Sequence, residues 1–360
     1  MSTFTPDDLR IALSSHLDTV VPPTSDLAGI RRQQRRNRAR KLAFATVVTA
    51  AAAAVVIGAV LLVRPGASPS TDSTPDFVSP GTLDYSEGLR AYADPGRVLF
   101  LGGRSLPADD FAYLDTDAAA TAYGMVFFDA GRPMLLREKG DTEALYDGAV
   151  EASQAFHPTA KADAHSADVA FAVMHDDQVT LVVRDLDADR MVASRPLDCA
   201  DTCQDVVVDG IDHGVVFVRT GGGTYLWNVA NDDWTRFAGA QTRVADVRNR
   251  VVLYDGSAPT LPLNAWRYVQ GAVDAQLTFD GRHVLSWSPT LSPVSAADDP
   301  ITLKAPGAIF FTFDTDGSVL AATAGDPTTF LDCEVPSGKC EKLGTVKVTG
   351  GDPMFLGNDM

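Results

Sequence analysis

Hydrophobic residues are arranged in two different ways along the chain. Residues 42–63 form one apolar stretch of 22 residues without a charge or a proline. As an α-helix this stretch would be about 33 Å long, at ~1.5 Å per residue, and would match the ~30 Å hydrocarbon core of a bilayer. A helix also satisfies its own backbone hydrogen bonds, as lipid requires. The pattern therefore predicts a single transmembrane α-helix over residues 42–63.

The other apolar residues follow a linker rich in Pro, Ser and Thr at residues 64–81 and occur in short runs. The runs are rich in Val, Phe, Tyr and Leu and are separated by turns of Asp, Gly and Asn. Such a pattern is typical of β-strands joined by tight turns. The one segment that could instead form an amphipathic helix lies around 143–156. The pattern predicts that residues 82–360 form an all-β domain.

These strands recur with a rough period. The turns after the strongest strands are separated by 28, 46, 45, 34, 34 and 35 residues, and lie at Gly103, Gly131, Asp177, Gly222, Gly256, Thr290 and Gly325. A four-stranded propeller blade takes roughly 40–45 residues, and closing the blades into a ring buries their apolar faces. We therefore expect a β-propeller of seven blades, with six as the alternative because the first step is short. An array of two-sheet sandwiches is the competing fold.

A short tail precedes the apolar stretch. Leu9, Leu13 and Leu17 recur every four residues within 6–20, and Pro22 and Pro23 follow. The spacing predicts a short amphipathic helix that ends before the prolines. Such a helix either lies on the membrane surface or binds a cytoplasmic partner.

Charge is distributed unevenly. The whole chain carries a net charge of −17, but residues 1–64 carry +5 and the remainder −22. The basic residues include seven directly before the apolar stretch: Arg31, Arg32, Arg35, Arg36, Arg38, Arg40 and Lys41. Positive residues stay on the cytoplasmic side, so we expect residues 1–41 to be a cytoplasmic tail that pairs with anionic lipid headgroups. The acidic β-domain would lie outside the cell membrane and would repel nucleic acid. A cleaved signal peptide is the alternative, but no A-x-A site follows the stretch.

The arrangement of the first 65 residues resembles that of a known group of proteins. Asp8-Leu9-Arg10, Leu13 and His16, then Val21-Pro22-Pro23, then the arginine cluster and an alanine-rich span, resemble actinobacterial single-pass membrane proteins. In that group the span precedes an extracytoplasmic β-propeller of the WD40/TolB-like kind, and some members look like partners of extracytoplasmic-function sigma factors. The zinc-binding anti-sigma signature His-x-x-x-Cys-x-x-Cys does not occur, because His16 has no cysteine near it.

The four cysteines come as two close pairs, Cys199 with Cys203 and Cys333 with Cys340. Disulfides persist outside the cytoplasm, and the second pair flanks a polar turn between two strands. We predict that both pairs are structural disulfides, each contributing roughly 2–2.5 kcal/mol. A zinc site is the alternative, but Cys-x3-Cys without a nearby histidine is a poor zinc spacing.

The sequence holds no recognisable catalytic motif. Neither a nucleophile elbow, nor His-Glu-x-x-His, nor a P-loop, nor a dinucleotide fingerprint occurs. Three motifs that resemble sites are better explained as hairpin turns: the glycine run 221–223, the calcium-like D-x-D-x-D of 185–189, whose sixth position is Arg190 instead of glycine, and Asp314 with Asp316.

Histidines and tryptophans give weak signals. His157 and His165 lie near Asp163 and Asp168 and could form a metal cluster, although exposed loop histidines are the ordinary explanation. The four tryptophans lie on or beside strands and are expected to pack blades together. They are Trp227, Trp234, Trp266 and Trp287.

Together these patterns predict a non-enzymatic protein without a cofactor, a metal or catalytic residues. We expect a propeller anchored at the cell membrane that binds or senses a protein, peptide or glycan outside it. One alternative is a transmembrane regulator whose tail binds a sigma factor. Another is a propeller hydrolase or lyase whose catalytic residues converge on the axis from several blades.

Overall fold

A computed structural model describes part of the chain. It covers 91–94, 97–100, 104–107, 118–137, 142–150, 156, 158–197, 205–260, 263–272, 274–325, 327–347 and 354–355. The predicted tail, transmembrane helix and linker, residues 1–81, lie outside these described residues. Within the described residues, no helix has the length and apolar character needed to cross a membrane.

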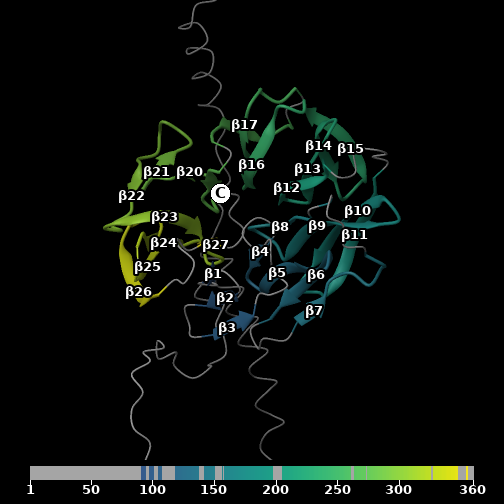
Figure 1. The fold of residues 1–360 in the computed structure, drawn as a ribbon. Coiled ribbons are helices and arrows are strands. Elements are labelled where there is room, and N and C mark those ends of the chain that lie inside the picture. Colours follow the sequence, from purple (N-terminus) through teal and green to yellow (C-terminus); the bar gives the residue numbers. More distant parts are fainter. Residues whose placement is uncertain are drawn as a thin grey trace, which may run out of the picture. The chain divides into compact units, whose positions relative to one another are not determined.

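The described residues contain β-strands grouped in sheets, which we number in chain order (Figure 1). Six of the sheets have four strands each, in the following orders. The first sheet is β27 (Met354–Phe355), β1 (Ala91–Asp94), β2 (Arg97–Phe100) and β3 (Arg104–Pro107). The second is β4 (Ala119–Thr121), β5 (Gly124–Asp129), β6 (Arg132–Leu136) and β7 (Thr142–Ala144). The third is β8 (Ala160–Ala162), β9 (Asp168–His175), β10 (Gln178–Asp185) and β11 (Arg190–Pro196).

The later sheets also consist of strands that follow one another in the chain. The fourth is β12 (Val207–Asp212), β13 (Val215–Thr220), β14 (Gly223–Asn228) and β15 (Asp233–Ala238). The fifth has three strands, β16 (Arg243–Arg248), β17 (Val251–Asp255) and β18 (Arg267–Gln270). The sixth is β19 (Gln276–Leu277), β20 (His283–Leu285), β21 (Thr290–Pro293) and β22 (Ile301–Thr302). The seventh is β23 (Ala308–Phe313), β24 (Val319–Thr323), β25 (Thr328–Cys333) and β26 (Cys340–Val346).

Hydrophobic clusters join neighbouring sheets from the second to the seventh, and the seventh sheet to the first. Phe171 of the third sheet packs with Leu135 of the second, and Trp227 of the fourth packs with residues of the third. Similar clusters join the fourth sheet to the fifth, the fifth to the sixth and the sixth to the seventh. Phe330 of the seventh sheet meets Phe355 of β27, with ring centroids 6.3 Å apart. The apolar faces are therefore buried between neighbouring sheets, as in a propeller.

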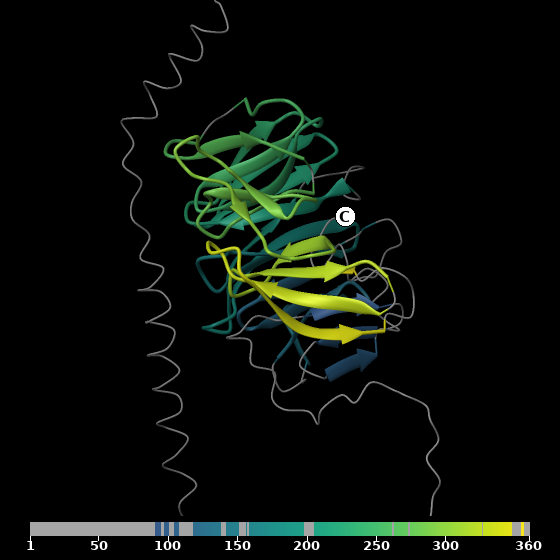
Figure 2. The same cartoon turned by 90° about the vertical axis from the view of Figure 1, so that its left-hand side faces the viewer.

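The two ends of the propeller are joined through the first sheet. β27, near the C-terminus, pairs with β1 in antiparallel register, with Phe355 opposite Tyr92 and Met354 opposite Ala93. A late strand thus completes the earliest sheet and fills an edge that would otherwise be open. Figure 2 shows the stacked sheets of the domain from the side.

Burial follows the position of a strand within its sheet. β9 reads DVAFAVMH and is buried from Val169 to Met174 on both faces, because neighbouring sheets cover both. The outer strand β11 reads RMVASRP and is mostly exposed. Continuous apolar runs therefore mark strands between two sheets, and alternating polar runs mark the rim.

The predicted all-β propeller is confirmed. Among the described residues, six sheets are complete four-stranded antiparallel blades, the number expected above as the alternative to seven, and the fifth sheet, with three strands, departs from the pattern. Its third strand, β18, runs parallel to β17 after a connection that contains Pro259. Parallel neighbours require such a crossover instead of a tight hairpin. The helix considered around 143–156 is not present in residues 142–150, where β7 is followed by bends and irregular chain.

Candidate functional site

The first strands of neighbouring sheets lie side by side, so the turns that follow them gather at one end of these inner strands. We call these the inner turns. In the fourth and fifth sheets they have two residues each, His213-Gly214 and Asn249-Arg250, and all four have positive φ. Two-residue turns of this type match the twist of the flanking strands, and glycine and asparagine tolerate the backbone they require.

Polar side chains connect these inner turns from sheet to sheet. Oδ2 of Asp163 accepts the backbone N–H of His213 at 2.9 Å, which joins the third sheet to the fourth. Asp212 accepts the backbone N–H groups of Asn249 at 3.2 Å and Arg250 at 2.7 Å, which joins the fourth to the fifth. Asn249 Nδ2 then donates to the carbonyl of Asp280 at 2.8 Å, which joins the fifth to the sixth.

A second row of such bonds comes from side chains on or beside the first strands. Asp246 accepts the N–H of Leu277 at 2.7 Å, joining the fifth sheet to the sixth. Gln276 Oε1 accepts the N–H of Phe313 at 3.1 Å, joining the sixth to the seventh. Hydrogen bonds to charged acceptors are shorter and stronger than neutral ones, so these carboxylates stabilise the ring.

A histidine–aspartate cluster occupies the inner turns of the third and fourth sheets. His213 Nδ1 lies 2.9 Å from Asp212 Oδ2, and His165 Nδ1 lies 3.4 Å from Asp212 Oδ1. The two imidazole rings are 5.3 Å apart, centroid to centroid, and tilted by 42°. Asp212 is fully buried, while the side chains of His165 and His213 are 15% and 34% exposed. We refer to His165, Asp212 and His213 as the inner-turn cluster.

The environment of Asp212 favours its ionised form. Burial alone would raise its pKa, but the neighbouring His165 imidazole, the N–H of Arg250 and the His213 side chain together lower the pKa below its ordinary value. The cluster therefore holds a carboxylate anion between two imidazoles. Such a set can coordinate a divalent metal ion or hold a shared proton.

Asp209 is another buried acid on β12, and it has a different environment. Burial raises its pKa, and the guanidinium of Arg219 opposes this shift. The two side chains make two hydrogen bonds, of 3.2 and 3.3 Å. A cation of this chain already satisfies the carboxylate, so Asp209 is a structural residue.

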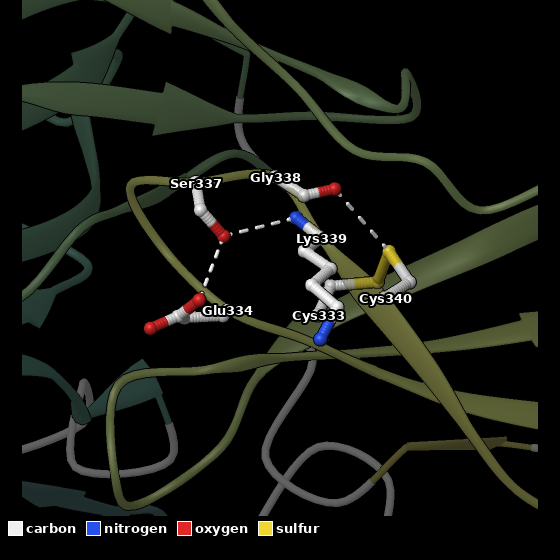
Figure 3. Close-up of a disulfide and its surroundings, with 6 residues drawn as sticks. All are labelled: Cys333, Glu334, Ser337, Gly338, Lys339 and Cys340. Atoms are coloured by element: carbon white, nitrogen blue, oxygen red, sulfur yellow. Dashed lines mark hydrogen bonds between the residues drawn. A yellow bond between two sulfur atoms is a disulfide. The ribbon is translucent and has the colours of Figure 1, made fainter.

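The prediction for the second cysteine pair is confirmed. Cys333 ends β25 and Cys340 begins β26, directly opposite each other in the ladder, and they form a disulfide (Figure 3). The turn between them is further fixed by Ser337, which donates to Glu334 at 2.7 Å and accepts the N–H of Lys339 at 3.1 Å. The first pair, Cys199 and Cys203, lies outside the described residues, as do the basic residues Arg31 to Lys41.

The motifs interpreted as turns are turns. Asp185 accepts the N–H groups of Asp187 and Ala188 at the β10–β11 turn, and Arg184 pairs with Asp189 at 2.6 Å. The glycine run 221–223 forms the β13–β14 turn and the start of β14. Asp314 and Asp316 likewise accept backbone N–H groups in the β23–β24 turn.

Three of the four tryptophans pack as expected. Trp227 is buried between the third and fourth sheets and donates to Asp232 at 2.9 Å; Trp234 and Trp266 are partly buried against hydrophobic clusters. The prediction is wrong for Trp287, whose side chain is 57% exposed in the β20–β21 turn. A turn at the outer end of a hairpin has no neighbouring sheet to cover it.

The sequence suggested only part of the inner-turn cluster. It paired His165 with His157 and the nearby acids; Asp163 does accept the N–H of His165 at 2.7 Å, whereas His157 lies outside the described residues. Asp212 and His213 were not identified, because they come from the next sheet, about 50 residues away in sequence. The sequence did contain one signal for these residues: Asp212, His213 and Gly214 form a turn between two apolar strands.

Comparison with known proteins gives similarities of fold alone. No family model and no curated protein matches the chain. Similar solved structures include TolB from Acinetobacter baumannii, with 12% identity over 73% of this chain and 64% of that chain, at a TM-score of 0.35. They also include the WD40 repeats of RRP9, with 11% identity over 73% of this chain and 78% of that chain, at a TM-score of 0.32. A prolyl endopeptidase is similar with 12% identity over 72% of this chain and 50% of that chain, at a TM-score of 0.38. The chain thus spans less than two thirds of that TolB chain.

Proposed function

We propose that this chain is a membrane-anchored propeller that binds a partner outside the cell membrane. Residues 1–41 would be the cytoplasmic tail, 42–63 the transmembrane helix and 64–81 the linker. The propeller at 82–360 would be the binding module. The topology rests on the length of the apolar stretch and on the seven basic residues before it.

One observation carries the binding role: a tryptophan is presented on a fixed turn. Trp287 is 57% exposed, and the turn that holds it is anchored on both sides. Within the turn, Ser288 Oγ accepts the N–H of Thr290 at 3.2 Å, and the carbonyl of Pro289 accepts the N–H of Leu303 at 2.7 Å. A large aromatic side chain on a rigid support loses little entropy on binding, and tryptophan is enriched at interface hot spots.

Site-specific photocrosslinking tests this role. A photoreactive phenylalanine analogue is placed at Trp287 in the full-length protein, and intact cells are irradiated. The matched control carries the same analogue at Asn231, an exposed polar position in the β14–β15 turn. We expect a discrete adduct from position 287 that is weak or absent from position 231. Equal labelling at both positions, or none at 287, would contradict a binding role for this turn.

Protease treatment of intact cells tests the topology separately. We expect the C-terminal domain to be digested while an epitope at the N-terminus survives. Protection of the C-terminal domain in intact cells, with digestion only after lysis, would overturn the proposed orientation.

A further inference from the structure

A gap in polar pairing lies within the inner-turn cluster. Both ring nitrogens of His165 are buried, and neither has a hydrogen-bond partner among the described residues. A neutral imidazole has one N–H donor and one acceptor nitrogen, and buried polar groups normally find partners. An imidazole whose buried nitrogens lack hydrogen-bond partners, with Nδ1 only within ion-pair distance of two carboxylates, points to a ligand that would complete its environment.

The charge around this imidazole indicates what kind of ligand is needed. The side chains of Asp163 and Asp212 are 1% and 0% exposed. Within the described part of the chain, their ion-pair contacts are with His165 and His213, and no Lys or Arg pairs with them. Burying a carboxylate is costly unless a cation or several hydrogen bonds compensate it. Backbone N–H groups compensate both carboxylates in part, but two acids face two imidazoles here with no Lys or Arg of the described residues paired to them, so the cluster is suited to a cation.

We propose that His165, Asp212 and His213 bind one divalent transition-metal ion, for which zinc is the best match. One donor atom from each residue already lies within 4.8 Å of the others. Two imidazole nitrogens and a carboxylate oxygen form a donor set that zinc uses in proteins, with a fourth position left for water or another ligand. His213, 34% exposed, provides the side from which the ion enters.

The surrounding hydrogen bonds hold the three ligands in place. Asp163 accepts the backbone N–H groups of both histidines, from His165 at 2.7 Å and from His213 at 2.9 Å. Asp212 is itself fixed by the N–H groups of Asn249 and Arg250. Partners outside the immediate ligands commonly orient them and strengthen metal binding. The proposed site is independent of Trp287 and of the binding role assigned to it.

Zinc titration of the full-length protein tests the proposal. The protein is purified in mild detergent, stripped with a chelator, dialysed and titrated with zinc chloride in a calorimeter. The variants are His165→Phe, which replaces the imidazole by an apolar ring, and His213→Asn, which removes it but keeps a residue that tolerates positive φ. The control is His175→Ala, which removes an exposed histidine outside the cluster, at the end of β9 beside Asp176.

We expect one zinc ion per wild-type chain and the same affinity for His175→Ala. Each cluster variant should bind zinc at least ~100-fold more weakly, because loss of a ligand exceeds the ~10–100-fold cost of losing a supporting residue. A second measurement separates loss of a ligand from misfolding. Without metal, His165→Phe should unfold at a temperature equal to or above that of the wild type, because the buried unpaired nitrogens are gone.

Two results would overturn the proposal. One is unchanged zinc affinity in both cluster variants, which would place the ion elsewhere. The other is no zinc binding by the wild-type protein at 100-fold molar excess, which would leave His165 as a metal-free core residue.

Discussion

The bond from Asp212 to the next sheet gives the strongest quantitative test of the ring. Asp212→Asn keeps the size of the side chain but removes its charge and one acceptor oxygen. The carboxylate now accepts two backbone N–H groups, from Asn249 and Arg250, with both oxygens. The amide retains one oxygen, and its NH2 group must face the other N–H donor.

The size of the effect follows from these contacts. A hydrogen bond to a charged group contributes roughly 1.5–3 kcal/mol, and a buried donor left unpaired costs roughly 1–3 kcal/mol. Loss of one such bond together with one unpaired donor predicts a decrease of about 3 kcal/mol or more in the free energy of unfolding. At ~2–4 °C per kcal/mol, the unfolding midpoint should fall by about 6–12 °C.

The assay is denaturant and thermal unfolding of the full-length protein, followed by tryptophan fluorescence. The control is Asp177→Asn, the same chemical change at an exposed residue with φ of 57° in the β9–β10 turn. Asparagine tolerates that backbone, so this variant should change the free energy of unfolding by less than ~0.5 kcal/mol. If Asp212→Asn behaved like the control, the sheet-to-sheet bonds would not stabilise the ring.

The same substitution should also change the response to acid. The pKa of Asp212 is lowered from its ordinary value of 3.8, so the folded state binds its proton more weakly than the unfolded state does. The stabilisation is therefore complete above the unfolded pKa and is lost as pH falls through the lower folded pKa. The difference in stability between wild type and Asp212→Asn should be present above pH 3.8 and shrink as the pH falls below it. A stability difference that grew on acidification would contradict the lowered pKa of Asp212.

Two further predictions concern single structural features. Replacing Cys333 and Cys340 by alanine should lower the free energy of unfolding by about 2 kcal/mol, the loop-entropy value for so short a ring. The measurement is urea unfolding of the variant against the oxidised wild type. Gly210→Ala should lower the free energy of unfolding by roughly 1–3 kcal/mol, because the new methyl would lie 2.9 Å from Cγ2 of Val247 on the neighbouring sheet. In the double variant, Val247→Ala should relieve part of that effect.

Much of the fold was accessible from local patterns. Short apolar runs separated by Asp-Gly and Asn-rich turns predict antiparallel hairpins, and the structure has such hairpins at 224–237 and 311–322. A strand covered on both faces must be apolar throughout, as β9 is, so strand position can also be inferred. These features depend on residues close in sequence.

The exceptions depend on contacts that no local pattern encodes. Strand β18 pairs in parallel with β17, a pairing across a connection that no local pattern predicts. The exposure of Trp287 depends on whether another sheet covers its turn. The inner-turn cluster needs the third and fourth sheets to be placed side by side before His165 and His213 can meet.

The bonds between sheets also explain why the repeat is hard to see. The residue that reaches the next sheet is an aspartate at 163, 212 and 246, an asparagine at 249 and a glutamine at 276. Each acts on the backbone of its neighbour, which every residue possesses, so the neighbour's side chain is free to vary. The four junctions from the third sheet to the seventh therefore each have a polar group that reaches the next sheet, but not the same residue. At the junction between the fourth and fifth sheets, the carboxylate that makes the bonds, Asp212, also lies against two histidines, His165 and His213.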